Sequence, residues 1–186
     1  MLYDQIGNRK YLTAQERRRF IEVAHRKAPA IDFFCLTLAY TGGRISEVLA
    51  LRARSIDLSA GVIVFESLKK RRKGVYRQVP VPQALLRHLV ALSKRGGANA
   101  DNRLWPWSRT TAWKLVKEAM READIPPFCA MPKALRHAFG VVGVAEVKVP
   151  LNIMQKWLGH ARIETTAIYA NAVGPEERAI ARRMWR

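Results

Sequence analysis

Residues 158–170 read LGHARIETTAIYA and place His160 nine positions before Tyr169, near the end of a chain of 186 residues. Taken alone, a tyrosine in such a segment is a packed aromatic whose hydroxyl group is hydrogen-bonded. A tyrosine can also be a nucleophile when neighbouring groups activate its phenol oxygen. The rest of the sequence decides between these interpretations through the order and spacing of its motifs.

The charge of the chain is strongly unbalanced, with 33 Lys and Arg against 15 Asp and Glu and a formal net charge of +18. Such an excess is typical of proteins that bind a polyanion, so nucleic acid is the expected partner and an anionic membrane the second choice. No apolar run approaches the length of a bilayer span, and MLYDQIGNRK lacks the apolar core of a signal peptide. These features predict a cytoplasmic protein without membrane association.

The length of the chain fits one domain that buries its own core. Cys35 and Cys129 are far apart, and each lies in an apolar setting, so we expect no disulfide between them. No cluster of cysteine and histidine residues indicates a zinc site, and we expect no bound metal.

The hydrophobic pattern is mostly helical. Thr13 followed by Glu16 forms a capping-box pattern, which predicts a helix from about residue 13. The apolar stretch AIDFFCLTLAY is long enough to favour a buried helix over a strand, and it should end at Thr41–Gly43. A short helix is expected in RISEVLAL, and further helices after Pro82 are expected in QALLRHLVALSKR, TTAWKLVKEAMREA, PKALRHAFGVVGVAEV, LNIMQKWLGH, ETTAIYANA and PEERAIARRMW.

Between these helices, β-branched runs separated by turn residues predict a small antiparallel sheet of three strands. The strands are expected near 54–58, 61–67 and 75–81. The predicted fold class is therefore α+β and mainly helical. Residues 1–11 are expected to form an N-terminal tail, and residues 12–186 a single domain.

Five blocks of sequence, in this order, resemble the catalytic domain of the tyrosine recombinases, the phage integrase family: TGGRISEVLAL, a lysine-bearing hairpin that ends in VPVP, LRHAFG, WLGH and TTAIYA. The resemblance runs from LTAQE at residue 12 to about Asn171. Chance could supply LRH or LGH alone, but all five blocks in family order are specific. The resemblance implies the fold of that catalytic domain and an enzyme that cleaves and rejoins DNA, as the integrases of mobile elements do.

The resemblance also implies roles for individual residues. Arg44 and Arg136 would hold the non-bridging oxygens of a scissile phosphate with their planar guanidinium groups. His160 would hydrogen-bond the same phosphate, and Tyr169 would attack the phosphorus to give a 3′-phosphotyrosyl link and a free 5′-hydroxyl. Rejoining then needs neither ATP nor metal, so no cofactor is expected. Arg44, Arg136 and His160 follow loops or begin helices, where we expect their side chains at the protein surface.

In the family a hairpin lysine acts as general acid towards the departing 5′-oxygen. The segment SLKKRRKG offers several candidates, of which we choose Lys69, with Lys70 as the alternative. Glu47 matches an acidic family position and is expected to orient Arg44, the alternative being a plain surface salt bridge. The basic residues expected to contact DNA are Lys70, Arg71, Arg72, Lys73 and Arg109.

One departure from the family pattern concerns His-x-x-Arg, where this chain has Lys133 three positions before Arg136. A lysine cannot accept a proton at neutral pH unless its pKa is strongly depressed, but it can donate to a phosphate. His137 is the neighbour of Arg136 in sequence, and we expect its side chain to point about 100° away from that of Arg136 around the helix. We therefore do not expect it to replace the missing histidine. Because of this substitution, a DNA-binding regulator that has the same fold but no catalytic activity is an alternative function. A type IB topoisomerase is a second alternative.

A second departure concerns the N-terminus. Family integrases usually carry an N-terminal core-binding domain that closes around DNA, and only about eleven residues precede the resemblance here. A fragment and a natural short integrase both remain open. In relatives four protomers synapse two DNA sites through docked C-terminal segments, which implies a homotetramer on DNA, while packing of this segment within its own protomer is an equal alternative.

The segment LWPWSRTTAWK places aromatic residues beside basic ones. We expect Trp105, Trp107 and Trp113 to pack in the protein. The start of the following helix, residues 108–110, is expected to meet backbone phosphate.

Overall fold

The computed structural model describes residues 2–66, 74–95, 101–171, 178 and 181–185. Its longer elements are α1 (Ala14–Ala24), α2 (Pro29–Thr41), α3 (Ile45–Leu49), β1 (Ile56–Asp57), β2 (Val62–Glu66), β3 (Tyr76–Pro80), α4 (Gln83–Arg95), α5 (Arg109–Glu122), α6 (Pro132–Val141), α7 (Leu151–Leu158) and α8 (Glu164–Ala167). Short turns complete them: η1 (Ala53–Ser55), η2 (Val142–Glu146), η3 (Ile168–Asn171) and η4 (Arg182–Trp185). Helices dominate, and the predicted α+β class is confirmed.

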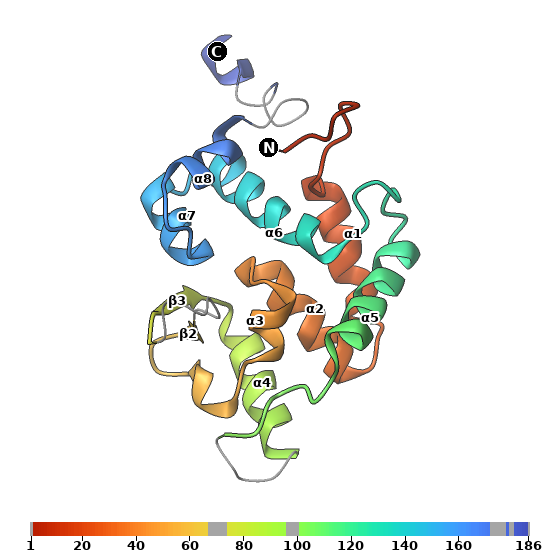
Figure 1. Ribbon diagram of the computed structural model, residues 1–186, viewed down its shortest axis with the longest axis vertical. Helices are drawn as coiled ribbons and strands as arrows, with labels where there is room; N and C mark the ends of the chain where they lie inside the picture. The colour runs from red at the N-terminus through yellow and green to blue at the C-terminus, as the bar shows by residue number, and fades with distance from the viewer. Residues whose placement is uncertain (1, 67–73, 96–100, 172–177, 179–180, 186) are drawn as a thin grey trace.

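Helix α2 lies at the centre of the molecule and contacts α1, α3, α4 and α6 (Figure 1). The three-stranded sheet lies on the opposite side of α2 and α3 from α1 and α5, and α6 crosses between α8 and α1. Helix α7 contacts strand β3, while η3 contacts α6. This arrangement brings the start of α3, the middle of α6 and the loop after α7 towards one another.

Local sequence signals account for the first two helices. Thr13 Oγ1 accepts from the Glu16 backbone N–H at 3.3 Å, and Glu16 Oε2 accepts from the Thr13 N–H at 2.8 Å, which confirms the predicted capping box. Helix α2 ends at Gly42 with a φ of +60°, a left-handed conformation that favours glycine. A Cβ atom at Gly42 would come within 2.7 Å of the Phe139 ring, so this glycine also allows α6 to approach.

The sheet has the order β1-β2-β3 with antiparallel pairs, including Ile63 opposite Val79 and Phe65 opposite Arg77. The side chains of Ile63, Phe65 and Val79 are buried and join the core. Strand β1 is shorter than the predicted 54–58, because residues 53–55 form the 3-10 turn η1 in which Ser55 Oγ accepts from the Arg52 N–H. Most of the segment SLKKRRKG, residues 67–73, lies outside the described residues.

The remaining helices follow their predicted positions, with two differences. The predicted helix 132–147 is regular only to Val141 and continues as the π-helical turn η2. The segment ETTAIYANA contains only four residues of α-helix before the 3-10 turn η3. In PEERAIARRMW, residues 175–177, 179 and 180 lie outside the described residues, and Arg182–Trp185 form the 3-10 turn η4. No helix within the described residues is long and apolar enough to cross a membrane.

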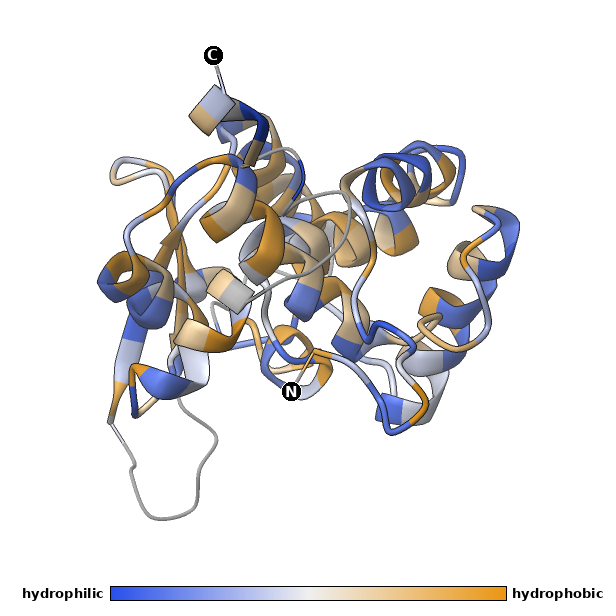
Figure 2. Ribbon diagram, turned by 90° about the horizontal axis from the view of Figure 1, so that it is seen from above, coloured by the Kyte–Doolittle hydropathy of each residue, from blue (hydrophilic) through white to orange (hydrophobic). Residues whose placement is uncertain are grey.

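The core consists of two clusters, and hydrophobic ribbon segments gather towards the centre of Figure 2 while hydrophilic ones lie mostly at its periphery. Trp105 is fully buried in the larger cluster and donates its indole N–H to the Ala30 carbonyl at 2.8 Å, and Trp107 packs beside it. Cys35 and Cys129 are both buried free thiols. The second cluster contains Leu2, Tyr11, Val141, Ala145, Met154, Leu158 and Tyr169.

Candidate functional site

A cleft of about 490 Å³ joins parts of the chain that are distant in sequence. Its walls come from the start of α3, the first turns of α5 and α6, the loop after α7 and the turn η3. Five of the six catalytic residues predicted from the sequence line it: Arg44, Lys133, Arg136, His160 and Tyr169. The sixth, Lys69, and the neighbouring Lys70, Arg71, Arg72 and Lys73 lie outside the described residues.

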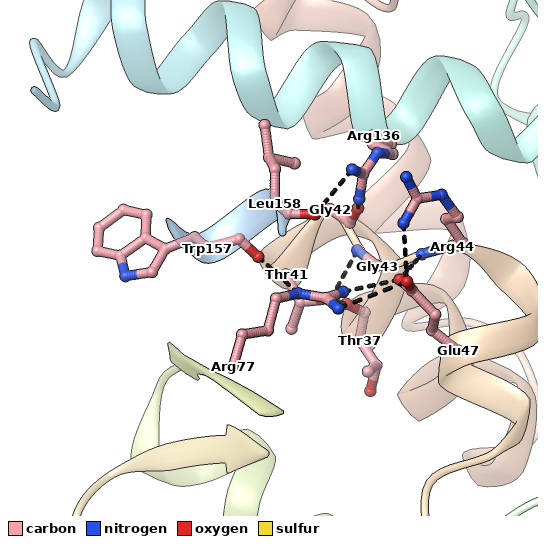
Figure 3. Close-up of polar contacts among 10 residues, drawn as sticks. All are labelled: Thr37, Thr41, Gly42, Gly43, Arg44, Glu47, Arg77, Arg136, Trp157 and Leu158. Carbon is pink, nitrogen blue, oxygen red and sulfur yellow. Dashed lines mark hydrogen bonds and ion pairs between the residues drawn. The ribbon is translucent and has the colours of Figure 1, made fainter. Parts of the chain in front are cut away.

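Arg136 lies inside the protein with only 7% of its surface exposed, so the expectation of a surface side chain is wrong. Its Nη1 donates to the Gly42 carbonyl at 2.7 Å and its Nη2 to the Leu158 carbonyl at 2.8 Å (Figure 3). Burial and the nearby Arg44 lower the pKa of Arg136 to about 10, so the group stays cationic at neutral pH. Two of the five guanidinium N–H donors take part in these bonds, which leaves others for an anion.

Arg44 stands at the N-cap of α3 with 43% of its side chain exposed. Its Nη1 donates to Glu47 Oε1 at 2.8 Å, and its backbone N–H donates to Glu47 Oε2 at 2.9 Å. Glu47 is only 5% exposed, so the alternative of a plain surface salt bridge is wrong. Burial alone would raise the pKa of Glu47, but Arg77 and Arg44 lower it overall, and the carboxylate is charged at neutral pH.

His160 is fixed by the turn that ends α7. Gly159 is left-handed with a φ of +68°, and the His160 N–H donates to the Gln155 carbonyl at 3.1 Å. The ring Nδ1 lies 2.9 Å from Oγ1 of Thr166, a fully buried residue. Burial, Arg136 and Arg44 lower the pKa of His160 to about 4, so the imidazole is neutral at pH 7. When Thr166 donates to Nδ1, Nε2 carries the hydrogen and can donate to a bound anion.

Tyr169 is only 1% exposed and packs against both histidines of the site. Its ring stacks on His160 with centroids 6.2 Å apart, and it lies over Gly140, where a Cβ atom would come within 2.6 Å of the ring. The hydroxyl oxygen lies 3.3 Å from His137 Nδ1. Burial raises the pKa of Tyr169, and Arg136 and Arg44 oppose that rise, so the phenol is protonated at neutral pH.

Lys133 and His137 both line the cleft, but Lys133 is exposed and His137 is buried. Lys133 is exposed in the first turn of α6 and lines the cleft. His137 is 8% exposed, and its Nε2 has no hydrogen-bond partner among the described residues. The expectation that His137 points away from the site is wrong, because Tyr169 crosses α6 at Gly140, on the same helical face as His137. Burial and Lys133 lower the pKa of His137 to about 4, so it is neutral at pH 7.

Helix α5 supplies the rim of the cleft. Arg109 is exposed and lines the cleft together with Trp113. Trp113 is 44% exposed, with Lys117 Nζ 5.5 Å from its ring centre, so the expectation that it packs in the protein is wrong. Ser108 Oγ accepts from the Thr111 N–H at 3.0 Å and thereby caps the helix.

Arg77 on β3 is a residue that the sequence analysis missed. Its side chain is 9% exposed; Nη2 lies 2.7 Å from Glu47 Oε2, and Nε donates to the Trp157 carbonyl at 2.9 Å. The alternation of YRQVP contains a signal for this position, because Arg77 shares a strand face with the buried Val79. An arginine on the inner face of a strand needs buried partners, which the sequence alone does not identify.

Comparison with known proteins places this geometry in context. Residues 10–174 match the model of the phage integrase family. The chain is similar to tyrosine recombinase XerA of Pyrococcus furiosus, with 31% identity over 169 residues, which cover 86% of this chain and 56% of that protein. The chain thus spans little more than half of that relative.

Two solved structures extend the similarity to the fold. A crystal structure of XerA recombinase aligns with a TM-score of 0.79 and 25% identity, covering 94% of this chain and 64% of that one. The catalytic domain of bacteriophage HP1 integrase aligns with a TM-score of 0.66 and 22% identity, covering 92% of this chain and 93% of that one. The chain therefore belongs to the phage integrase family and has the fold of a tyrosine recombinase catalytic domain.

Proposed function

We propose that this protein is a site-specific DNA recombinase that cleaves and rejoins DNA strands through Tyr169, without metal or ATP. The observation that supports it most is the convergence of Arg44, Arg136, His160 and Tyr169 on one cleft from distant parts of the chain. Two guanidinium groups and a neutral imidazole suit a phosphodiester, because they supply directed N–H donors to its non-bridging oxygens. The net charge of +18 fits double-stranded DNA as the partner.

In the proposed cleavage step the Tyr169 oxygen attacks the phosphorus, and the bond from phosphorus to the 5′-oxygen breaks. The phenol proton passes to His137 Nδ1, which lies 3.3 Å from the hydroxyl oxygen. The bound phosphate raises the proton affinity of this imidazole through its negative charge. Lys133, exposed at the cleft, donates to the phosphate.

The departing 5′-oxygen needs a proton, which we assign to Lys69, with Lys70 as the alternative. The ester to Tyr169 conserves the energy of the broken bond, so a 5′-hydroxyl can reverse the step and rejoin the strand. For a complete exchange we propose four protomers on two DNA sites. The mass of the complex on duplex DNA, measured by analytical ultracentrifugation, tests this assembly.

The experiment begins with selection of duplexes that the protein binds from a random-sequence library. Selected sites are then made with a nick close to the scissile phosphate, so that cleavage releases a short fragment and traps the covalent adduct. We expect an adduct with the wild-type protein and none with Tyr169→Phe, which removes the attacking oxygen but keeps the ring.

Two other outcomes would contradict the proposal, and each identifies a different function. A protein that binds its selected duplex but forms no adduct at any nick position is a DNA-binding regulator. Relaxation of supercoiled plasmid without recombinant products identifies a type IB topoisomerase.

A further inference from the structure

We propose that Arg77 is a positioning residue for the cleavage reaction: it fixes Glu47, and through it Arg44, relative to the turn that presents His160 (Figure 3). This inference rests on the proposed function, because it assigns Arg77 a role in the same reaction. Arg77 lines a hollow beside the main cleft together with Arg44, Glu47, Gly159 and His160.

In the first set of contacts, Arg77 and Arg44 both bind the carboxylate of Glu47. Glu47 Oε2 accepts from Arg77 Nη2 at 2.7 Å and from the Arg44 N–H at 2.9 Å. Glu47 Oε1 accepts from Arg44 Nη1 at 2.8 Å and from Arg77 Nη1 at 3.4 Å. Both oxygens are therefore held from two sides, and the orientation of the more exposed Arg44 depends on a carboxylate that Arg77 fixes.

The second set of contacts reaches the other wall of the site. Arg77 Nε donates to the Trp157 carbonyl at 2.9 Å, in the last turn of α7. A Cβ atom at Gly159 would come within 3.0 Å of Arg77 Cδ, so the turn before His160 lies directly on the arginine stem. Arg77 thus contacts both walls of the site.

The sheet holds the Arg77 side chain in place. Its guanidinium carbon lies 4.6 Å from the ring centre of Phe65 on the paired strand, which holds the side chain against the sheet. In sequence β3 follows the segment that contains Lys69, the proposed general acid. Arg77 does not line the main cleft, and its guanidinium group is bonded to Glu47 and to the Trp157 carbonyl, so its effect passes through Arg44 and the His160 turn.

A double-mutant cycle on the selected duplex tests the inference in the full chain. We expect Arg77→Lys to slow single-turnover adduct formation about 10- to 100-fold, because lysine cannot hold Glu47 and Trp157 together. The duplex dissociation constant should stay within about twofold of the wild-type value. Glu47→Gln should slow the reaction similarly, and the double variant should be no slower than the slower single variant, because both changes break the same path.

Arg19→Lys is the matched control. Arg19 also donates to main-chain carbonyls, those of Ala123 and Asp124, but it joins α1 to the end of α5 away from the cleft. We expect the wild-type rate from this variant, and rate effects that multiply when it is combined with Glu47→Gln. Circular dichroism establishes that each variant is folded.

The dependence of the rate on pH separates positioning from general loss of structure. Arg77→Met removes the cation that keeps the buried carboxylate charged, so the pKa of Glu47 should rise. The rate of this variant should therefore fall more steeply than that of wild type as the pH is lowered from about 8 to about 6. Parallel pH profiles, or rate effects of Arg77→Lys and Glu47→Gln that multiply, would overturn the inference.

A spectroscopic readout keeps the inference testable apart from the chemistry. The guanidinium signal of Arg44 in nitrogen-15 spectra, assigned by its loss in Arg44→Lys, should shift or broaden in Arg77→Lys and stay unchanged in Arg19→Lys. An unchanged Arg44 signal in Arg77→Lys contradicts the role of Arg77 even if adduct formation is slowed. Absence of adduct in the wild type, by contrast, counts against the proposed function alone.

Discussion

The two arginines of the cleft are held in opposite ways. Arg136 is buried and bonded to the main-chain carbonyls of Gly42 and Leu158, which do not titrate and move only with the backbone. Arg44 is 43% exposed and bonded to the side chain of Glu47, which titrates and depends on further partners. The guanidinium group of Arg136 is therefore fixed by the backbone, whereas the orientation of the Arg44 guanidinium group depends on another side chain. The predictions that follow test this difference.

The largest effect is expected from Arg136→Ala. It removes a proposed donor to the phosphate, which should slow adduct formation about 10³-fold. It also leaves two main-chain carbonyls without their partner, and the free energy of unfolding should fall by about 2 to 5 kcal/mol. Urea denaturation and the nicked-duplex assay measure the two losses. A variant as stable as wild type would contradict the structural part of this role.

Arg44→Ala should separate activity from stability. We expect adduct formation to slow about 10²-fold, because a donor to the phosphate is lost. The free energy of unfolding should change by less than about 1 kcal/mol, since the side chain is well exposed and Glu47 keeps Arg77 as its partner. Both quantities come from the same assays as for Arg136→Ala, and equal destabilisation by the two substitutions would remove the contrast.

On lowering the pH, His137 should be protonated before Glu47. The pKa of His137 is about 4 in the folded protein against an ordinary value of 6.5, so the unfolded chain binds more protons between these values. Its contribution to stability is complete above pH 6.5 and is lost as the pH falls towards 4, by at most about 3 kcal/mol. The pKa of Glu47 is lowered from 4.5, so its contribution is present above that value and is lost at still lower pH.

Urea denaturation at pH 7.5, 5.5 and 4.5 measures this order. The loss of stability between pH 7.5 and 4.5 should be smaller in His137→Gln than in wild type. In Glu47→Gln this loss should be nearly as large as in wild type. His160, whose pKa is also lowered to about 4, accounts for a further part of the wild-type loss. An unchanged pH profile in His137→Gln would show that this histidine does not titrate in the window.

The smallest effect is expected at the rim, beyond both arginines. Arg109 is exposed at the start of α5, so we expect Arg109→Ala to weaken duplex binding about fivefold. The slope of log affinity against log salt should decrease by about 1, as for one lost phosphate contact. Fluorescence anisotropy over a range of salt concentrations measures both, and an unchanged slope would place Arg109 outside the DNA interface.

Much of the fold could be predicted because its signals are local. The capping box of Thr13 and Glu16, and the glycine that ends α2, act within a few residues. The set of site residues was predicted from resemblance to a family rather than from periodicity, and five of the six residues predicted to be catalytic line one cleft.

The remaining features depend on contacts between distant segments. Arg136 is buried because α6 approaches the carbonyls at the ends of α2 and α7, which no pattern in LRHAFG indicates. His137 meets Tyr169 because a glycine on α6 lets the aromatic ring cross the helix, whereas its place next to Arg136, about 100° further round the helix, suggested that it points away. Strand alternation contains a signal for the inner position of Arg77, which the sequence analysis did not use, and the partners of Arg77 come from other elements.

Tyr169 belongs to the same core cluster as Leu2 and Tyr11, from the other end of the chain. The proposed nucleophile is therefore also a packing residue, and carrying its oxygen to a phosphate disturbs the contacts that those side chains make. In the proposed mechanism, the packing of Leu2 and Tyr11 therefore influences how readily the Tyr169 ring is released for the reaction.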